Sequence, residues 1–153
     1  TAPDLEAIFD RISLETRRAF GLDAPQLVCE PGRAMVAEAF TLVLRVKALR
    51  RDGAVFVNDG IYGTLAEWRD LEASGGLTVL APDGRVREAP LRRRVVFGPT
   101  CDSLDRLPEP LALPGDIAEG DFLIIPAMGA YASAIATGFN GYGQHDIITV
   151  ARS

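Results

Sequence analysis

The spacing of the apolar residues changes near Thr41, and this change limits the folds open to the chain. Between residues 5 and 20 the apolar side chains recur near a helical period. From Thr41 onward apolar and polar residues alternate, which places on one face Leu42, Leu44 and Val46. A period of two is typical of a strand with one buried face, so the chain passes from helical to β structure here.

Short strands separated by glycine and proline indicate a mostly β fold, an antiparallel barrel or sandwich, over residues 41–153. Residues 1–40 instead read as helix, strand, loop and short helix, which is one unit of an α/β array and cannot close a sheet alone. The expected strands are 26–30, 41–48, 54–57, 77–81, 92–97, 121–125 and 146–151, and the expected helices are 5–20, 34–40 and 128–136.

The composition argues against several classes of function. The 153 residues carry a net charge of −5, whereas nucleic-acid binding needs a basic face, so we expect no nucleic-acid partner. No apolar run reaches the length of a membrane span and no signal-peptide pattern opens the chain, so we expect a cytoplasmic protein with no membrane partner. The two cysteines, Cys29 and Cys101, lie far apart, and nothing requires a disulfide between them.

The segment Glu30-Pro31-Gly32-Arg33 has the makings of an anion site. It lies between an expected strand and an expected helix, and backbone amides at a helix N-terminus attract phosphate. Gly32 lets the backbone approach a ligand, and Arg33 can add a charge-assisted contact. Taken alone, the four residues favour the simpler alternative, a turn with a surface salt bridge between Glu30 and Arg33.

A thiol and a carboxylate are neighbours in the loop that Gly98 and Pro99 open. Cys101 precedes Asp102 just after an expected strand, and loops held by rigid strands often carry chemistry. A free cysteine is nevertheless more often simple packing than a reactive group. Two cysteines without a histidine cluster do not suit a structural zinc site, and we expect no metal.

Aromatic residues accompany glycines toward the end of the chain. Tyr131 lies near the start of an expected helix, and the glycine-rich loop 138–143 contains Phe139. Such a loop can bring backbone close to a ligand or a partner. Its aromatic residues can equally serve as core or interface anchors, and the sequence alone leaves both readings open.

Four motifs, taken in order, resemble those of the pyridoxal-phosphate decarboxylases of basic amino acids with an alanine-racemase-like fold. Ornithine and lysine/ornithine decarboxylases are the most similar members. Order and spacing agree along the whole chain, and four linked motifs are far more specific than any one of them. The motifs are Glu30-Pro31-Gly32-Arg33, Asn58-Asp59-Gly60-Ile61-Tyr62-Gly63, Gly98-Pro99-Thr100-Cys101-Asp102 with Asp105-Arg106-Leu107, and Met128-Gly129-Ala130-Tyr131 with Phe139-Asn140-Gly141.

The resemblance implies a βα (TIM) barrel followed by a C-terminal β-domain. Residues 1–40 would then be the last segment of the barrel, and residues 41–153 the β-domain. The cofactor, pyridoxal 5'-phosphate, forms a Schiff base with a lysine of the early barrel in this family, so we expect an N-terminal barrel portion to be missing here. The only lysine, Lys47, lies on the polar face of an expected strand, where we expect it to face solvent, and His145 does not match the histidine that stacks on the cofactor.

The same resemblance assigns roles to individual residues. Glu30 would pair with the pyridine nitrogen of the cofactor, which keeps the ring protonated and able to accept electrons. The phosphate would be held by Gly32, Arg33 and Tyr131. Cys101 would be catalytic, helping to protonate the carbon that has lost carbon dioxide.

The substrate side of the site rests on Asp102 and Phe139. Asp102 would pair with the distal ammonium of the substrate, and Phe139 would line the pocket or the subunit contact. In the family the loop with Cys101 completes the site of the opposite subunit, which implies a homodimer with shared active sites. A second protein carboxylate that contacts the substrate should lie near Asp70. The spacing from Tyr62 is off by one residue, so Asp70, Glu67 or neither could serve.

The expected activity is pyridoxal-phosphate-dependent decarboxylation of a basic amino acid. Ornithine would give putrescine, as in polyamine biosynthesis, and lysine would give cadaverine; the sequence leaves the choice open. One alternative is a catalytically silent regulatory relative that acts by protein binding. Another is a stand-alone β-domain used as a binding module.

Overall fold

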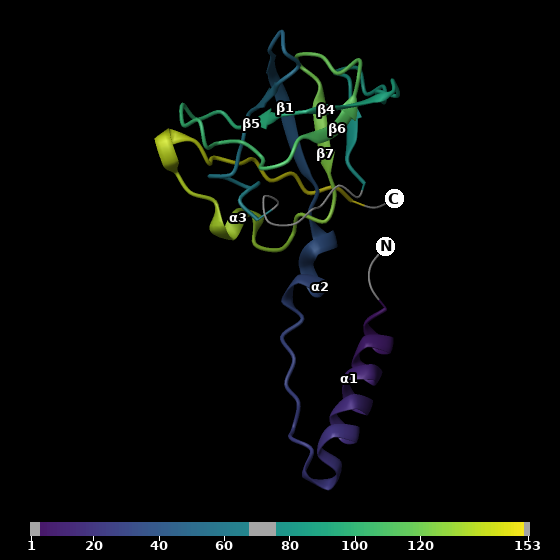
Figure 1. Cartoon of the computed structure of the whole chain (residues 1–153). Helices are drawn as coiled ribbons and strands as arrows, with labels where there is room; N and C mark the ends of the chain where they lie inside the picture. The colour runs from purple at the N-terminus through teal and green to yellow at the C-terminus, as the bar shows by residue number, and fades with distance from the viewer. Residues whose placement is uncertain (1–3, 68–75, 152–153) are drawn as a thin grey trace. The chain divides into compact units, whose positions relative to one another are not determined.

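The computed structural model describes residues 4–67 and 76–151, and Figure 1 shows the course of the chain. The chain divides into two compact units, residues 1–35 and residues 36–153. Each unit is described by itself below. Among the described residues no helix has both the length and the apolar character that crossing a membrane requires.

The first unit contains the helix α1 (Leu5–Phe20), which agrees with the helix predicted from the apolar period. The side chain of Asp4 accepts a hydrogen bond from the amide of Ala7, which satisfies one of the free amides of the first turn. Gly21 ends the helix at φ 59°, a left-handed conformation that glycine adopts at little cost. Two arginines in the last turn face the negative end of the helix dipole.

The short strand predicted at residues 26–30 is not present. These residues pair with no strand in the described part of the chain. Leu27 and Val28 are 49% and 85% exposed, so their side chains are not packed in a core. A strand needs a neighbour to satisfy its backbone amides and carbonyls, and apolar side chains alone do not supply one. The 3-10 helix η1 (Gly21–Asp23) precedes this segment, and α2 (Gly32–Val36) follows it.

The second unit is built on two sheets. The larger sheet has five strands in the order β3-β7-β1-β2-β5, and β4 pairs with β6 in a separate two-stranded sheet. These strands are β1 (Leu42–Leu49), β2 (Val55–Val57), β3 (Thr78–Leu80), β4 (Leu91–Arg94), β5 (Val96–Phe97), β6 (Leu111–Pro114) and β7 (Phe122–Ile125). The 3-10 helix η2 (Ala37–Ala39), the helix α3 (Ala132–Ile135) and the 3-10 helix η3 (Phe139–Gly141) complete the described elements.

A single apolar core joins the two sheets. Leu44 and Val46 of β1 and Leu123 of β7 are each at most 1% exposed, and Leu113 of β6 brings the smaller sheet into the same cluster. The predicted alternation along β1 is therefore confirmed. Lys47 lies on the opposite face of β1 and is exposed, as predicted.

The fold class, mostly β and sandwich-like, agrees with the prediction, but three details differ. β2 and β5 pair in parallel, so the sheet is not wholly antiparallel. The strand predicted at 146–151 is absent, because this exposed segment has no ladder partner in the described part of the chain. β6 was not predicted; it is a short edge strand that ends in Pro114, and proline weakens a strand signal.

The helix predicted at residues 128–136 is also too long. Only the four residues of α3 are helical. Tyr131, which precedes them, has φ 61°, in the left-handed region, so a right-handed helix cannot extend through it toward Met128.

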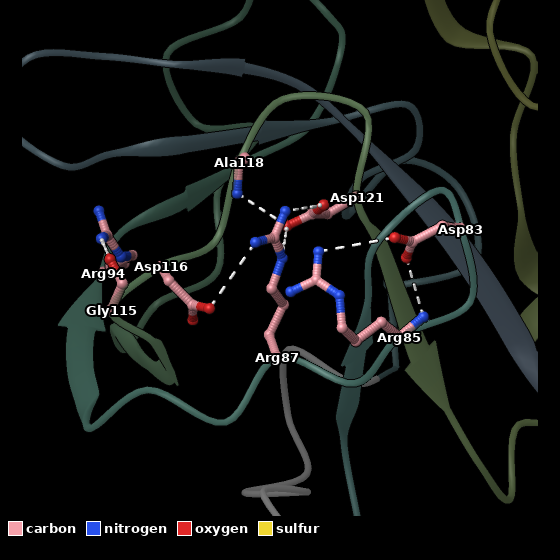
Figure 2. Close-up of polar contacts among 8 residues, drawn as sticks. All are labelled: Asp83, Arg85, Arg87, Arg94, Gly115, Asp116, Ala118 and Asp121. Carbon is pink, nitrogen blue, oxygen red and sulfur yellow. Dashed lines mark hydrogen bonds and ion pairs between the residues drawn. The ribbon is translucent and has the colours of Figure 1, made fainter.

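An ion pair fixes the segment after β3 to the start of β7 (Figure 2). Asp121 is fully buried and accepts two hydrogen bonds from the guanidinium of Arg87, at 3.0 and 2.9 Å, and a third from the amide of Ala118 at 2.7 Å. The hydrogen bonds that Arg87 donates to Asp121 raise the pKa of Arg87. A buried carboxylate satisfied in this way ties the edge strand β3 to its neighbour.

The alternation of β1 can be tested with two adjacent residues. Leu44→Ala removes a side chain that is 1% exposed and should lower the free energy of unfolding by about 2–5 kcal/mol, because it leaves a cavity in the core. Val43→Ala, at a position 51% exposed, is the matched control and should change it by less than about 0.5 kcal/mol. Urea denaturation followed by circular dichroism measures both; equal losses would contradict the assigned faces.

Candidate active site

The parallel pairing of β2 and β5 brings two distant loops together. Neighbouring parallel strands end at the same edge of a sheet. Residues 58–64 follow β2 and residues 98–105 follow β5, so the two loops leave the sheet side by side. The first loop carries the Asn-Asp-Gly motif and the second carries Cys101 and Asp102.

The carboxylate of Asp105 joins these loops. It is 1% exposed and accepts one hydrogen bond from the amide of Ile61 and one from the amide of Thr100, both 3.0 Å long. A Cβ atom at Gly60 or at Gly98 would overlap this carboxylate, so both glycines are required by its close approach. The loop that bears Cys101 is thus fastened to the loop that follows β2.

Most polar side chains of the Asn-Asp-Gly motif accept hydrogen bonds from backbone amides. Asn58 accepts a hydrogen bond from the amide of Arg45 at 2.6 Å. Asp59, which is 5% exposed, accepts from the amides of Gly60 and Thr64 at 2.8 and 2.9 Å and from the hydroxyl of Thr64. These residues shape the loop, and Tyr62 is the member of the motif whose side chain reaches Asp102.

Tyr62 and Asp102 form the central polar contact of the site. The phenol of Tyr62 donates to one carboxylate oxygen of Asp102 at 2.5 Å, and the amide of Leu104 donates to the other at 2.8 Å. The hydrogen bond from Tyr62, followed by that from Leu104, lowers the pKa of Asp102, and the same contact raises the pKa of Tyr62. Asp102 therefore carries a full negative charge at neutral pH.

The tail of the chain closes over Tyr62. The amide and the hydroxyl of Thr137 both donate to the carbonyl of Tyr62, at 2.8 and 2.9 Å. The ring of Phe139 packs against the ring of Tyr62 with centroids 4.5 Å apart. Asn140 follows Phe139 in the sequence. Its side-chain amide nitrogen lies 3.4 Å from the sulfur of Cys101, which is a free, exposed thiol.

Tyr131 is held by an unusual backbone conformation. Its φ is 61°, and its side chain is 53% exposed. The motif before it packs on the segment that follows α2: the amide of Met128 donates to Phe40 and that of Gly129 to Ala37. A Cβ atom at Gly129 would overlap the backbone there, so this approach requires glycine.

The remaining predicted residues are placed as follows. Glu30, Gly32 and Arg33 belong to the first unit: Glu30 is exposed just before α2, and Gly32 and Arg33 are its first two residues. Asp70 lies outside the described residues, and Glu67 is half-buried at the end of the loop that follows Tyr62. The structure thus brings together Cys101, Asp102 and Phe139, all within the second unit.

Three sets of contacts in the candidate site were not predicted from the sequence. They are the contact of Tyr62 with Asp102, that of Asn140 with Cys101, and those by which Asp105 joins the two loops. Tyr62, Asn140 and Asp105 lie within the motifs, but the contacts join residues about 40 positions apart. Their closeness depends on the parallel pairing of β2 and β5, for which alternation patterns give no signal.

Comparisons with known proteins identify relatives of this chain. A family model for the C-terminal sheet domain of pyridoxal-dependent decarboxylases matches residues 10–129. Ornithine decarboxylase of Saccharomyces cerevisiae is 32% identical over 142 residues, covering 77% of this chain and 30% of that protein. Antizyme inhibitor 2 of Xenopus laevis is 32% identical over 141 residues, covering 80% and 29%.

Solved structures place the fold in the same class. Lysine/ornithine decarboxylase of Vibrio vulnificus, complexed with cadaverine, matches with a TM-score of 0.69 and 32% identity over 94% of this chain and 39% of that one. The fold is thus that of the sheet domain of a pyridoxal-phosphate enzyme. The chain belongs to the pyridoxal-dependent decarboxylase family, and it spans about a third of the length of the curated relatives it matches.

The Tyr62–Asp102 contact predicts a pH-dependent stability. Because folding lowers the pKa of Asp102, the contact stabilises the folded state above the ordinary carboxyl pKa, about 3.9, and this stabilisation is lost as pH falls through the lowered value. Tyr62→Phe should therefore be less stable than the parent protein at neutral pH, and the difference should shrink below about pH 4. Urea denaturation at a series of pH values measures it.

Tyr142→Phe is the matched control for this series. The side chain of Tyr142 is 45% exposed and makes no side-chain hydrogen bond in the described part of the chain, so its loss should have little effect at any pH. A stability difference for Tyr62→Phe that is constant with pH would show that the phenol acts through packing alone.

Proposed function

We propose that the protein to which this chain belongs decarboxylates a basic amino acid with pyridoxal 5'-phosphate, converting ornithine to putrescine and accepting lysine as a second substrate. The observation that carries the proposal is the carboxylate of Asp102, which is kept charged by Tyr62 and lies next to an exposed thiol. The ornithine decarboxylase of Saccharomyces cerevisiae and the cadaverine complex of the Vibrio vulnificus enzyme support the same substrate class.

Asp102 is suited to bind the distal ammonium of such a substrate. Tyr62 and the amide of Leu104 each occupy one of its oxygens, and a carboxylate oxygen has further lone pairs to accept an ammonium proton. The ring of Phe139 packs against that of Tyr62, whose phenol bonds to Asp102, and the two rings would offer an apolar wall for the methylene chain.

The described residues also fit the cofactor. Tyr131 is 53% exposed, and a Cβ atom at Gly32 would meet no other atom within 4 Å, so there is space beside the backbone at the start of α2. Gly32, Arg33 and Tyr131 would hold the phosphate, and Glu30 would hold the proton of the pyridine nitrogen. When bound, the cofactor supplies a ring that accepts the electron pair left by carbon dioxide.

Cys101 is the proposed proton donor. Its thiol is exposed at the tip of the loop that Asp105 fixes, so it can face the substrate carbon that has lost carbon dioxide. Lys47 is not suited to bind the cofactor, because it lies on the exposed face of β1. The covalent lysine would come from an N-terminal barrel portion, and the site would be shared between the two subunits of a homodimer.

A catalytically silent regulatory protein is the second candidate. The similarity to Antizyme inhibitor 2 favours it. That relative is named as an inhibitor and not as a decarboxylase, so a similar sequence does not by itself require decarboxylation. Release of carbon dioxide from ornithine and lysine by the complete protein, supplied with cofactor, distinguishes the two functions. Release that depends on Cys101, lost or much reduced in Cys101→Ala, supports the enzyme; no release from either substrate supports the regulator.

Substrate recognition by Asp102 gives a sharper test. Asp102→Asn keeps the shape but removes the charge, so kcat/KM for ornithine should fall about tenfold to a hundredfold, mainly through KM. Asp52→Asn is the control, since Asp52 lies in the turn between β1 and β2, where it pairs with Arg50. Steady-state release of carbon dioxide measures both; an unchanged KM for Asp102→Asn would remove Asp102 from the substrate site.

A further inference from the structure

The sulfur of Cys101 has one hydrogen-bond partner in the described part of the chain. The side-chain amide of Asn140 donates to it, with nitrogen and sulfur 3.4 Å apart. The two residues are 39 positions apart, so this contact is made by the fold and not by local chain geometry. No basic side chain pairs with Cys101 among the described residues.

The position of Asn140 is fixed from several sides. Its φ of 53° is left-handed, a conformation that asparagine adopts more readily than most residues, and Gly141 continues it with φ 81°. The preceding Phe139 packs on Tyr62, and its amide donates to Thr137. The turn therefore aims the amide of Asn140 at the sulfur.

We propose that Asn140 is a positioning residue that orients the Cys101 thiol and stabilises the sulfur when it gives up its proton. This inference rests on the proposed function. As the proton moves, the Sγ–H bond breaks, the electron pair of the decarboxylated carbon forms the new C–H bond, and the negative charge remains on Sγ. The N–H group of Asn140 faces that charge, and hydrogen bonds to charged groups are stronger than those to neutral ones.

The charges around the loop make such a donor necessary. The next residue in the sequence, Asp102, bonds to the phenol of Tyr62, and this hydrogen bond lowers the pKa of its carboxyl. The charged carboxylate of Asp102 opposes a second negative charge on Cys101. In the described part of the chain, the amide of Asn140 is the group that offsets this charge at the sulfur.

Alkylation of Cys101 by iodoacetamide tests the contact without requiring turnover. Asn140→Gly removes the donor but keeps the left-handed backbone, so in the full-length protein alkylation should be about threefold to tenfold slower at about pH 7. Asn140→Asp should be slower still, because a carboxylate replaces the donor. Mass spectrometry of the peptide that contains Cys101 measures the rate.

The outcomes separate this inference from the proposed function. Equal rates for the parent protein and Asn140→Gly, or a faster rate for Asn140→Asp than for Asn140→Gly, would overturn the role of Asn140. In an active enzyme Asn140→Gly should lower kcat and leave KM for ornithine unchanged, because Asp102 and Tyr62 are intact; a change in KM alone would also overturn it. A protein that releases no carbon dioxide contradicts the proposed function, while the alkylation rates still decide the role of Asn140.

Discussion

The buried carboxylate of Asp105 joins the two site loops through hydrogen bonds to a backbone amide of each. It occupies the space that side chains at Gly60 and Gly98 would fill and receives the amides of Ile61 and Thr100. Without it, two part-buried amides would lose their partners, at a cost of up to about 1–3 kcal/mol each. The parallel pairing of β2 and β5 brings the loops to one edge, and Asp105 joins them there.

The motifs divide into residues that shape the backbone and residues that form the proposed site. Asn58 and Asp59 accept hydrogen bonds from main-chain amides, so they are part of the scaffold although they lie beside the site. Tyr62 belongs to both groups: its carbonyl anchors the tail through Thr137, and its phenol bonds to Asp102. One residue thus couples the position of the tail to the charge of the carboxylate.

The sequence predicts those features that depend on local patterns. The period of two along β1 predicted the burial of Leu44, and the neighbouring Cys101 and Asp102 were recognised as a candidate site. It did not predict β6 or the parallel pair β2–β5, because strand pairing is decided by distant segments. The strand expected at 26–30 failed for the same reason: its apolar residues find no strand partner in the described part of the chain.

The left-handed backbone at Tyr131 also limits which residues that position can accept. Among the described residues, only Ala127, Tyr131 and Asn140 adopt such a conformation without being glycine, and all three lie in the segment that leads from β7 into the tail. A valine or isoleucine at 131 would be disfavoured by its branched Cβ before the loss of the phenol is considered. The main chain by itself therefore restricts which residues can replace Tyr131.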